Sequence, residues 1–98
     1  MKMIYCTCDV SMLDSLLRAL EAMKVEEYEV YDKIVAKSRK GDPRLNTPIW
    51  PGYNASVMVS LGDEQAGEVI RRIQQMNREV ISENEWISVY SWEVERND

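Results

Sequence analysis

Hydrophobic residues recur along the chain with two periods, and each period predicts one type of element. Over residues 2–9, KMIYCTCD, β-branched and aromatic types dominate, which is typical of a first strand. From Ser11 onward apolar residues return every three or four positions, which predicts a helix over residues 11–24. Its apolar members are Met12, Leu13, Leu16, Leu17, Leu20 and Met23. Ser11, with Asp14 three residues later, is expected to cap its start.

The middle of the chain alternates between apolar and polar residues, which is the period of strands. Alternation over residues 27–38 predicts a long second strand, and alternation over residues 55–61 predicts a third. The apolar face of the second strand comprises Tyr28, Val30, Ile34 and Ala36. That of the third comprises Val57, Val59 and Leu61. We expect the two strands to be antiparallel neighbours joined by an elongated hairpin.

A second helix and a fourth strand complete the pattern. Gly62 and Asp63 open the helix, and Asp63 is its expected cap. The apolar stripe of this helix consists of Ala66, Val69, Ile70, Ile73 and Met76. A polar connection, NREVISENE, then leads into an apolar and aromatic strand at residues 86–94.

The resulting order, β-α-β-β-α-β, defines an α+β domain of the ferredoxin-like class, with two helices on one face of a four-stranded antiparallel sheet. Residues 1–98 are expected to form this single domain, because the chain is too short for two cores. The second sheet face is also rich in apolar residues, namely Tyr31, Val35, Met58, Tyr90 and Trp92. Without helices to cover it, this face predicts a homo-oligomer.

Composition narrows the functional classes. A net charge of −5 argues against a nucleic-acid-binding surface, because phosphate contacts need clustered Lys and Arg. The chain has no histidine, which removes His-dependent catalysis and imidazole metal ligation. No apolar run approaches the length of a membrane span. The start of the chain leads straight into a strand, so no signal peptide is expected. With its cysteines reduced, the protein is expected to be cytoplasmic.

Residues 41–54, GDPRLNTPIWPGYN, hold all three prolines of the chain and separate the second and third strands. Because proline restricts the backbone, this loop can present Trp50 and Tyr53 to a partner at low entropic cost. Asp42 belongs to the same candidate partner-binding surface. The alternative is that the two rings fold back onto the sheet and close the hairpin.

The base of this loop is basic in an otherwise acidic chain. Four cations surround one glycine, and the candidate ligand-binding set is Lys37, Arg39, Lys40, Gly41 and Arg44. Backbone amides freed by glycine, together with several cations, suit a phosphate or carboxylate ligand. The plainer alternative is a solvated loop base.

Cys6 and Cys8 lie on one face of the first strand and are the candidate metal ligands. Two thiols without histidine fall short of a tetrahedral site unless other subunits contribute ligands. Cysteine also behaves as a small core residue, so a metal is not expected.

In several segments the chain resembles the PII-like signalling proteins, which are trimers of ferredoxin-like subunits. The matching positions are Met1, Lys2, Ile4, Leu13, Asp14, Ala19, Leu20, Val30, Asp32, Arg39, Lys40, Gly41 and residues 62–65 and 68–70. The resemblance implies a homotrimer, a small effector in the cleft between subunits, and a T-loop at residues 41–54 that docks on a partner protein. An adenine nucleotide is the candidate effector, and Lys37, Arg39, Lys40, Gly41 and Arg44 are the candidate ligand contacts.

The same resemblance implies a signalling role such as nitrogen regulation and no enzymatic activity. A transporter or an enzyme is the expected partner, and any membrane association is indirect, through that partner. One segment departs from the family pattern: where PII proteins have a glycine-rich phosphate-binding stretch after the second helix, this chain has NREVISENE.

Two other classes remain open as alternatives. The first strand, Ile4-Tyr5-Cys6-Thr7, is similar to that of CutA-type proteins, which share the fold and the trimer. This similarity keeps a divalent-metal-binding trimer based on Cys6 and Cys8 as the second hypothesis. The third is an ACT-like module that binds a small molecule without nucleotide chemistry.

Overall fold

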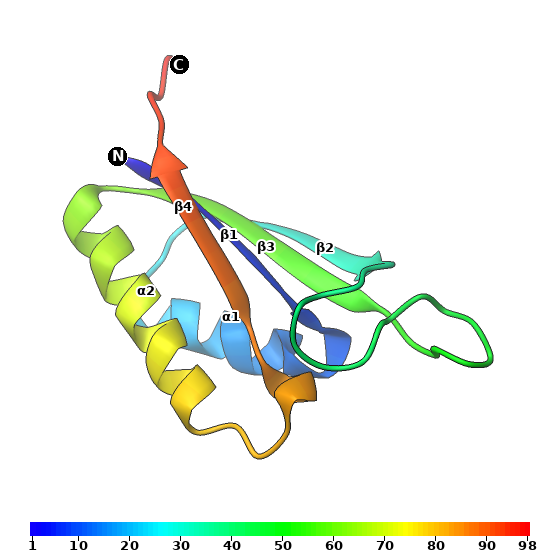
Figure 1. The fold of residues 1–98 in the computed structure, drawn as a ribbon. Helices are drawn as coiled ribbons and strands as arrows, with labels where there is room; N and C mark the ends of the chain where they lie inside the picture. Colours follow the sequence, from blue (N-terminus) through cyan, green and yellow to red (C-terminus); the bar gives the residue numbers. More distant parts are fainter.

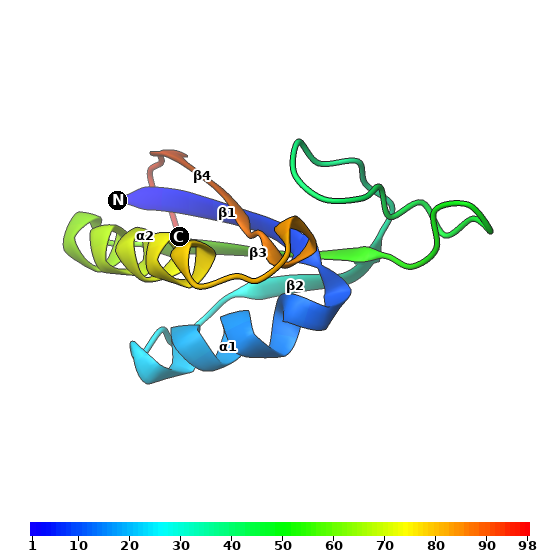
Figure 2. The ribbon, with the colours of Figure 1, turned by 60° about the horizontal axis from the view of Figure 1, so that its bottom comes forward.

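The computed structural model describes all 98 residues and has the predicted element order. One antiparallel sheet, in the order β2-β3-β1-β4, contains β1 (Lys2–Asp9), β2 (Glu29–Ile34), β3 (Asn54–Leu61) and β4 (Ser88–Glu93). Helices α1 (Leu13–Ala22) and α2 (Asp63–Arg78) lie on one side of this sheet (Figures 1 and 2). Two short 3-10 helices, η1 (Val10–Met12) and η2 (Glu83–Glu85), precede α1 and β4. The ferredoxin-like α+β fold is therefore confirmed.

The core lies between the helices and the inner face of the sheet. β1 alternates along its length, so that Ile4, Cys6 and Cys8 are buried while their neighbours are partly exposed. Val57, Val59 and Leu61 are buried on the same face, as their alternation predicts. The helices contribute the buried side chains Leu16, Leu20, Val69 and Ile73. Full burial of one such side chain contributes about 1.5–3 kcal/mol to the stability of the fold.

Both predicted helix caps are wrong. The turn before α1 is capped by Asp9, whose carboxylate accepts the backbone N–H of Ser11 at 3.1 Å. Asp9 is the last residue of β1 and directly precedes η1, so its side chain bonds to a free N–H group there. No side chain caps α1 itself. The N-cap of α2 is Gly62, and Asp63 instead pairs with the N-terminal ammonium at 2.9 Å.

Two strands are shorter than the alternation predicts. β2 covers residues 29–34 rather than 27–38, because its pairing with β3 shifts register between Tyr31 and Ile34. β4 begins at Ser88 rather than residue 86, because the backbone of Ile87 is bonded to a side chain of α2. That side chain is Asn77, which belongs to α2 and not to the predicted polar connection.

The segment between β2 and β3 consists of two loops rather than one. Ala36 and Arg44 form an isolated bridge with backbone bonds of 2.9 and 2.8 Å. This bridge separates an inner loop, residues 37–43, from an outer loop, residues 45–53. In the outer loop the carbonyl of Trp50 accepts the N–H groups of Leu45 and Thr47. Figure 1 shows the inner loop near η2 and the outer loop extending away from the sheet.

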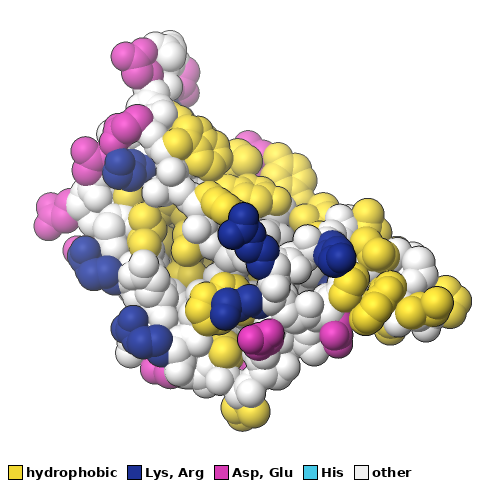
Figure 3. Space-filling model, in the orientation of Figure 1, with side chains coloured by type: hydrophobic (Ala, Val, Ile, Leu, Met, Phe, Trp, Pro, Cys, Tyr) yellow, Lys and Arg dark blue, Asp and Glu magenta, His cyan; other side chains and the backbone are white.

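The face of the sheet opposite the helices is apolar and uncovered. We call it the open sheet face, and its large apolar side chains are Met3, Tyr5, Tyr31, Met58, Tyr90 and Trp92, with Thr7, Ser56 and Ser60 beside them. Tyr5 pairs in register with both Met58 and Tyr90 and lies at the centre of this face. Tyr90 and Trp92 are 57% and 45% exposed. Figure 3 shows hydrophobic side chains gathered beside β4, and again on the outer loop. This arrangement agrees with the two apolar faces that the sequence predicts.

Candidate functional site at the base of the loop

The inner loop carries most of the predicted anion-binding residues. Lys37, Arg39 and Lys40 are exposed, and Gly41 and Arg44 are half-buried. The loop folds against η2 and the end of β1, and the space between them is about 10 Å³. A cavity of that size holds at most one water molecule. Lys40, Gly41 and Arg44 line this space, whereas Lys37 and Arg39 do not, and side chains of the protein fill it.

Arg44 forms an ion pair with Asp9. Its Nε donates to Asp9 Oδ1 at 2.5 Å, and the two side chains are only 17% and 18% exposed. The Nη1 atom of Arg44 donates to the carbonyls of Asp42 and Pro43 at 3.4 and 3.2 Å. Burial acts to raise the pKa of Asp9, but hydrogen bonds from Ser11 and Arg44 outweigh it and lower the pKa below its ordinary value. Asp9 is therefore ionised at neutral pH and neutralises Arg44.

Two further contacts hold the inner loop against η2. The backbone N–H of Asp42 donates to Asn84 Oδ1 at 2.7 Å, and Asn84 Nδ2 donates to the carboxylate of Asp42 at 3.4 Å. The Lys40 ammonium lies 4.5 Å from the ring centroid of Trp86, a cation–π contact. Gly41 has φ +82°, and a Cβ at this position would lie 2.7 Å from Asn84 Oδ1. Only glycine therefore fits this approach of the loop to η2.

Sequence reasoning missed three members of this site, namely Asp9, Asn84 and Trp86. In the sequence Asp9 only ends a strand pattern, and Asn84 belongs to a polar connection. Asn84 lies 42 positions from Asp42 along the chain, so no local pattern could relate them. Only the path of the inner loop across the end of the sheet brings these residues to the basic cluster.

The aromatic residues of the predicted docking loop lie in different surroundings. Trp50 is 40% exposed in the outer loop, and its N–H donates to Thr47 Oγ1 at 2.9 Å. Its neighbour Ile49 is 78% exposed. Tyr53 is half-buried, and its carbonyl accepts the N–H of Val10 at 3.1 Å. Trp50 is thus available to a partner, whereas Tyr53 lies where the hairpin closes against η1.

Cys6 and Cys8 face the hydrophobic core. They are 1% and 2% exposed and free of disulfides. Burial, with a smaller effect from a neighbouring thiol or carboxylate, raises the pKa of each to about 12. Both thiols are therefore protonated at neutral pH, and metal ligation requires the thiolate. No group of three or more His, Cys, Asp or Glu side chains is placed to hold a metal ion. This packing favours the interpretation of both cysteines as core residues.

The burial of these thiols predicts that neither reacts in the native protein. At pH 8 we expect a thiol reagent such as Ellman's reagent to modify Cys6 and Cys8 only after unfolding in guanidinium, because the reagent needs an accessible thiolate. The measurement is the absorbance of the released chromophore with and without denaturant. Rapid modification of native protein would contradict the placement of these side chains.

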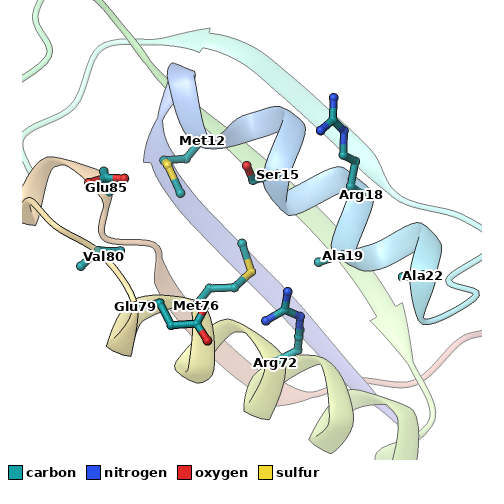
Figure 4. A pocket seen from close by; sticks show the side chains of 10 residues that line it. All are labelled: Met12, Ser15, Arg18, Ala19, Ala22, Arg72, Met76, Glu79, Val80 and Glu85. Carbon is teal, nitrogen blue, oxygen red and sulfur yellow. The ribbon is translucent and has the colours of Figure 1, made fainter.

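A separate open groove lies between the two helices. It has a volume of about 440 Å³, and Figure 4 shows Met12 of η1 with Ser15 and Ala19 of α1 facing Arg72 and Met76 of α2. Glu79, just after α2, and Glu85 of η2 line the same groove. Its mixture of both charges with apolar side chains indicates no single ligand chemistry.

None of the helices combines the length and the apolar character that crossing a membrane requires.

Comparison with known proteins supports the fold. No protein-family model and no curated protein matches the sequence. A protein of Thermus thermophilus described as a PII-like signalling protein superposes with a TM-score of 0.66, covering 93% of this chain and 82% of that chain at 12% identity. CPII from Thiomonas intermedia, bound to ADP and bicarbonate, gives a TM-score of 0.68, covering 97% and 88% at 13% identity.

A second structure of CPII, there called a nitrogen regulatory PII-like protein and bound to ADP, AMP and bicarbonate, gives a TM-score of 0.66. It covers 99% of this chain and 94% of that chain at 12% identity. At this level of identity the similarity shows the fold alone. The protein has the fold of PII-like signalling proteins, which confirms at that level the resemblance predicted from the sequence.

Proposed function

We propose that this protein is a PII-like regulatory protein that acts as a homotrimer. In this proposal a small effector binds in the cleft between subunits, and the outer loop docks on a partner protein. The observation that carries it is the similarity of the whole chain to PII-like structures, among them CPII with bound ADP. No enzymatic activity is part of the proposal, and the cytoplasm is the proposed location.

The open sheet face supports the trimer. It carries six large apolar or aromatic side chains on the side of the sheet that has no helices. Monomeric proteins rarely expose large apolar patches, so a second copy of the chain is the occupant we propose. The same face is available in every subunit, as a closed symmetric assembly requires.

The basic cluster at the loop base supports an anionic effector. Lys37 and Arg39 are exposed and form no ion pair in the structure, and Lys40 and Arg44 lie beside them. An adenine nucleotide is the first candidate, because its phosphates match a cluster of cations. The glycine-rich phosphate segment of PII proteins has no counterpart here, so the proposal assigns phosphate contacts to the loop base.

The outer loop supports the docking role. Its exposed apolar residues Leu45, Ile49 and Trp50 extend away from the sheet on a backbone closed by its own hydrogen bonds. Such a surface suits an apolar pocket on a partner, with Trp50 as an anchor. A transporter or an enzyme, as in nitrogen regulation, is the proposed kind of partner, and a transporter would bring the protein to a membrane indirectly.

Thermal denaturation in the presence of ATP, ADP and AMP tests the effector. At a hundredfold excess over the dissociation constant, we expect a stabilisation of about 2.7 kcal/mol. The double variant Lys37→Gln/Arg39→Gln should lose most of this shift, because it removes two cations from the loop base. A matched control, Arg71→Gln/Arg78→Gln, removes two exposed cations from α2 and should retain it.

Divalent metal ions are tested in the same assay. If metals alone raise the melting temperature and Cys6→Ser/Cys8→Ser abolishes the effect, the nucleotide proposal fails in favour of the metal-binding alternative. If neither nucleotides nor metals shift the transition, the effector part of the proposal fails.

A further inference from the structure

We propose that the anion site at the loop base is occupied by the protein's own side chains, and that an external oxyanion binds there by displacing them. Asp9 is the internal ligand of Arg44, and Asn84 is the internal ligand of the Asp42 amide. Their displacement would release the inner loop from β1 and η2. This inference rests on the proposed function, because it concerns how the same site is regulated.

The internal contacts reproduce those that an oxyanion would make. A carboxylate oxygen of Asp9 accepts from the Arg44 guanidinium at 2.5 Å, as an oxygen of a carboxylate or phosphate ligand would. A carboxamide oxygen of Asn84 accepts the Asp42 N–H at 2.7 Å, where a second ligand oxygen would bind. The positive φ of Gly41 holds the loop so that this N–H faces η2. Two acceptor oxygens and the negative charge of Asp9 therefore already occupy these positions, with the carboxylate of Asp42 beside them.

The charges at the site favour a ligand that carries more than one negative charge. Asp9 pairs with Arg44, and the carboxylate of Asp42 bonds to Asn84, whereas Lys40 has no carboxylate partner and its ammonium rests on the ring of Trp86. A dianion can pair with both cations and thus replace Asp9 with a net gain in ion pairing. A monoanion such as acetate only exchanges one carboxylate for another. We therefore expect phosphates to displace the internal contacts and acetate to leave them in place.

The contacts also connect the site to the rest of the chain. Asp9 caps η1 at the entry to α1, and Asn84 lies in η2 at the entry to β4, which borders the open sheet face. On the other side, Arg44 is followed directly by the outer loop at Leu45. Ligand binding would therefore loosen the attachment of the proposed docking loop, and the bridge between Ala36 and Arg44 would remain as its hinge.

Hydrogen exchange of the free protein tests the internal occupancy without any ligand. Asn84→Ala removes the acceptor of the Asp42 N–H, and Asp9→Asn removes the charge while an amide oxygen can still cap η1. Loss of a single hydrogen bond should speed exchange of amides in residues 37–44 by roughly five- to tenfold. The controls are Asn97→Ala and Asp32→Asn, which change exposed residues away from this site. Unchanged exchange in both test variants overturns the proposal.

Titration with inorganic pyrophosphate tests the displacement. A site that is mostly closed has an apparent affinity reduced by the open fraction, so both test variants should bind pyrophosphate about five- to tenfold more tightly than the wild type. Adding Arg44→Gln should abolish binding in each background, and acetate should not compete. Equal affinity of wild type and variants, or no binding by variants whose inner loop exchanges rapidly, overturns the proposal.

The two hypotheses can fail separately. Nucleotide stabilisation of the wild type tests the proposed function, whereas the gain of pyrophosphate affinity in Asn84→Ala and Asp9→Asn tests the internal occupancy. If nucleotides do not stabilise the wild type but the variants gain pyrophosphate affinity, the proposed nucleotide effector is wrong and the internal occupancy is supported. If nucleotides stabilise the wild type but the variants gain no pyrophosphate affinity, the effector is supported and the internal occupancy is wrong.

Discussion

Replacing Tyr90 and Trp92 with lysine is expected to convert the proposed trimer to a monomer. Both rings lie on β4 at the edge of the open sheet face, 57% and 45% exposed in the single chain. A neighbouring subunit that covers them removes roughly 100 Å² of apolar surface per ring, which stabilises the assembly by about 2.5 kcal/mol each. Lysine removes this stabilisation and places an ammonium group in an apolar interface.

Light scattering coupled to size exclusion measures the outcome directly. The wild type should show three times the chain mass of 11.4 kDa, and Tyr90→Lys/Trp92→Lys should show the chain mass alone. Ile49→Lys and Ile81→Lys are matched controls, because they add the same charge at apolar positions that are 78% and 97% exposed and lie off the open sheet face. A wild type that is monomeric at micromolar concentration would refute the proposed assembly.

Replacing Asn77 with leucine is expected to destabilise the fold by roughly 2–5 kcal/mol. Asn77 is buried at the end of α2, and its carboxamide makes two hydrogen bonds of 2.8 Å with the N–H and C=O of Ile87. Ile87 is fully buried, so the substitution leaves two backbone groups without partners and without water. The side chain thus attaches α2 to the chain just before β4.

Urea denaturation of the Asn77→Leu variant measures this loss as a lower transition midpoint. Asn97→Leu is the matched control, because Asn97 is exposed near the C-terminus, and its midpoint should change little. Asn77→Asp should be intermediate, because a carboxylate can accept the N–H of Ile87 but cannot donate to its C=O. A midpoint unchanged in Asn77→Leu would show that these bonds are not needed for stability.

The fold could be predicted because its signals are local and repeated. The alternation of Ile4, Cys6 and Cys8 and the helical spacing of Val69 and Ile73 each identify an element from a few neighbouring residues. Boundaries were less predictable, because they depend on contacts made elsewhere. Asp9 caps the turn before α1, and Asn77 holds the backbone of Ile87 out of β4.

The candidate site could be predicted only in part. The cluster of cations around Gly41 was visible in the sequence, because these residues are consecutive or nearly so. Their internal partners Asp9, Asn84 and Trp86 were not, because groups that meet across 35 to 46 positions leave no periodic signal. The division of the hairpin at Ala36 and Arg44 was also missed, because backbone groups form this bridge and leave no side-chain pattern.

The sequence by itself determined the element order, the apolar inner face of the sheet, the apolar character of the open sheet face and the presence of a basic loop base. These properties follow from spacing and residue type, which act over one or two turns of chain. The tertiary structure alone decided that Asp9 neutralises Arg44 and that Asn84 accepts a hydrogen bond from the Asp42 N–H. It also decided that Cys6 and Cys8 face the core. Such pairings depend on how the sheet brings distant segments together, because ion pairs and hydrogen bonds form between groups that are close in space, whatever their separation along the chain.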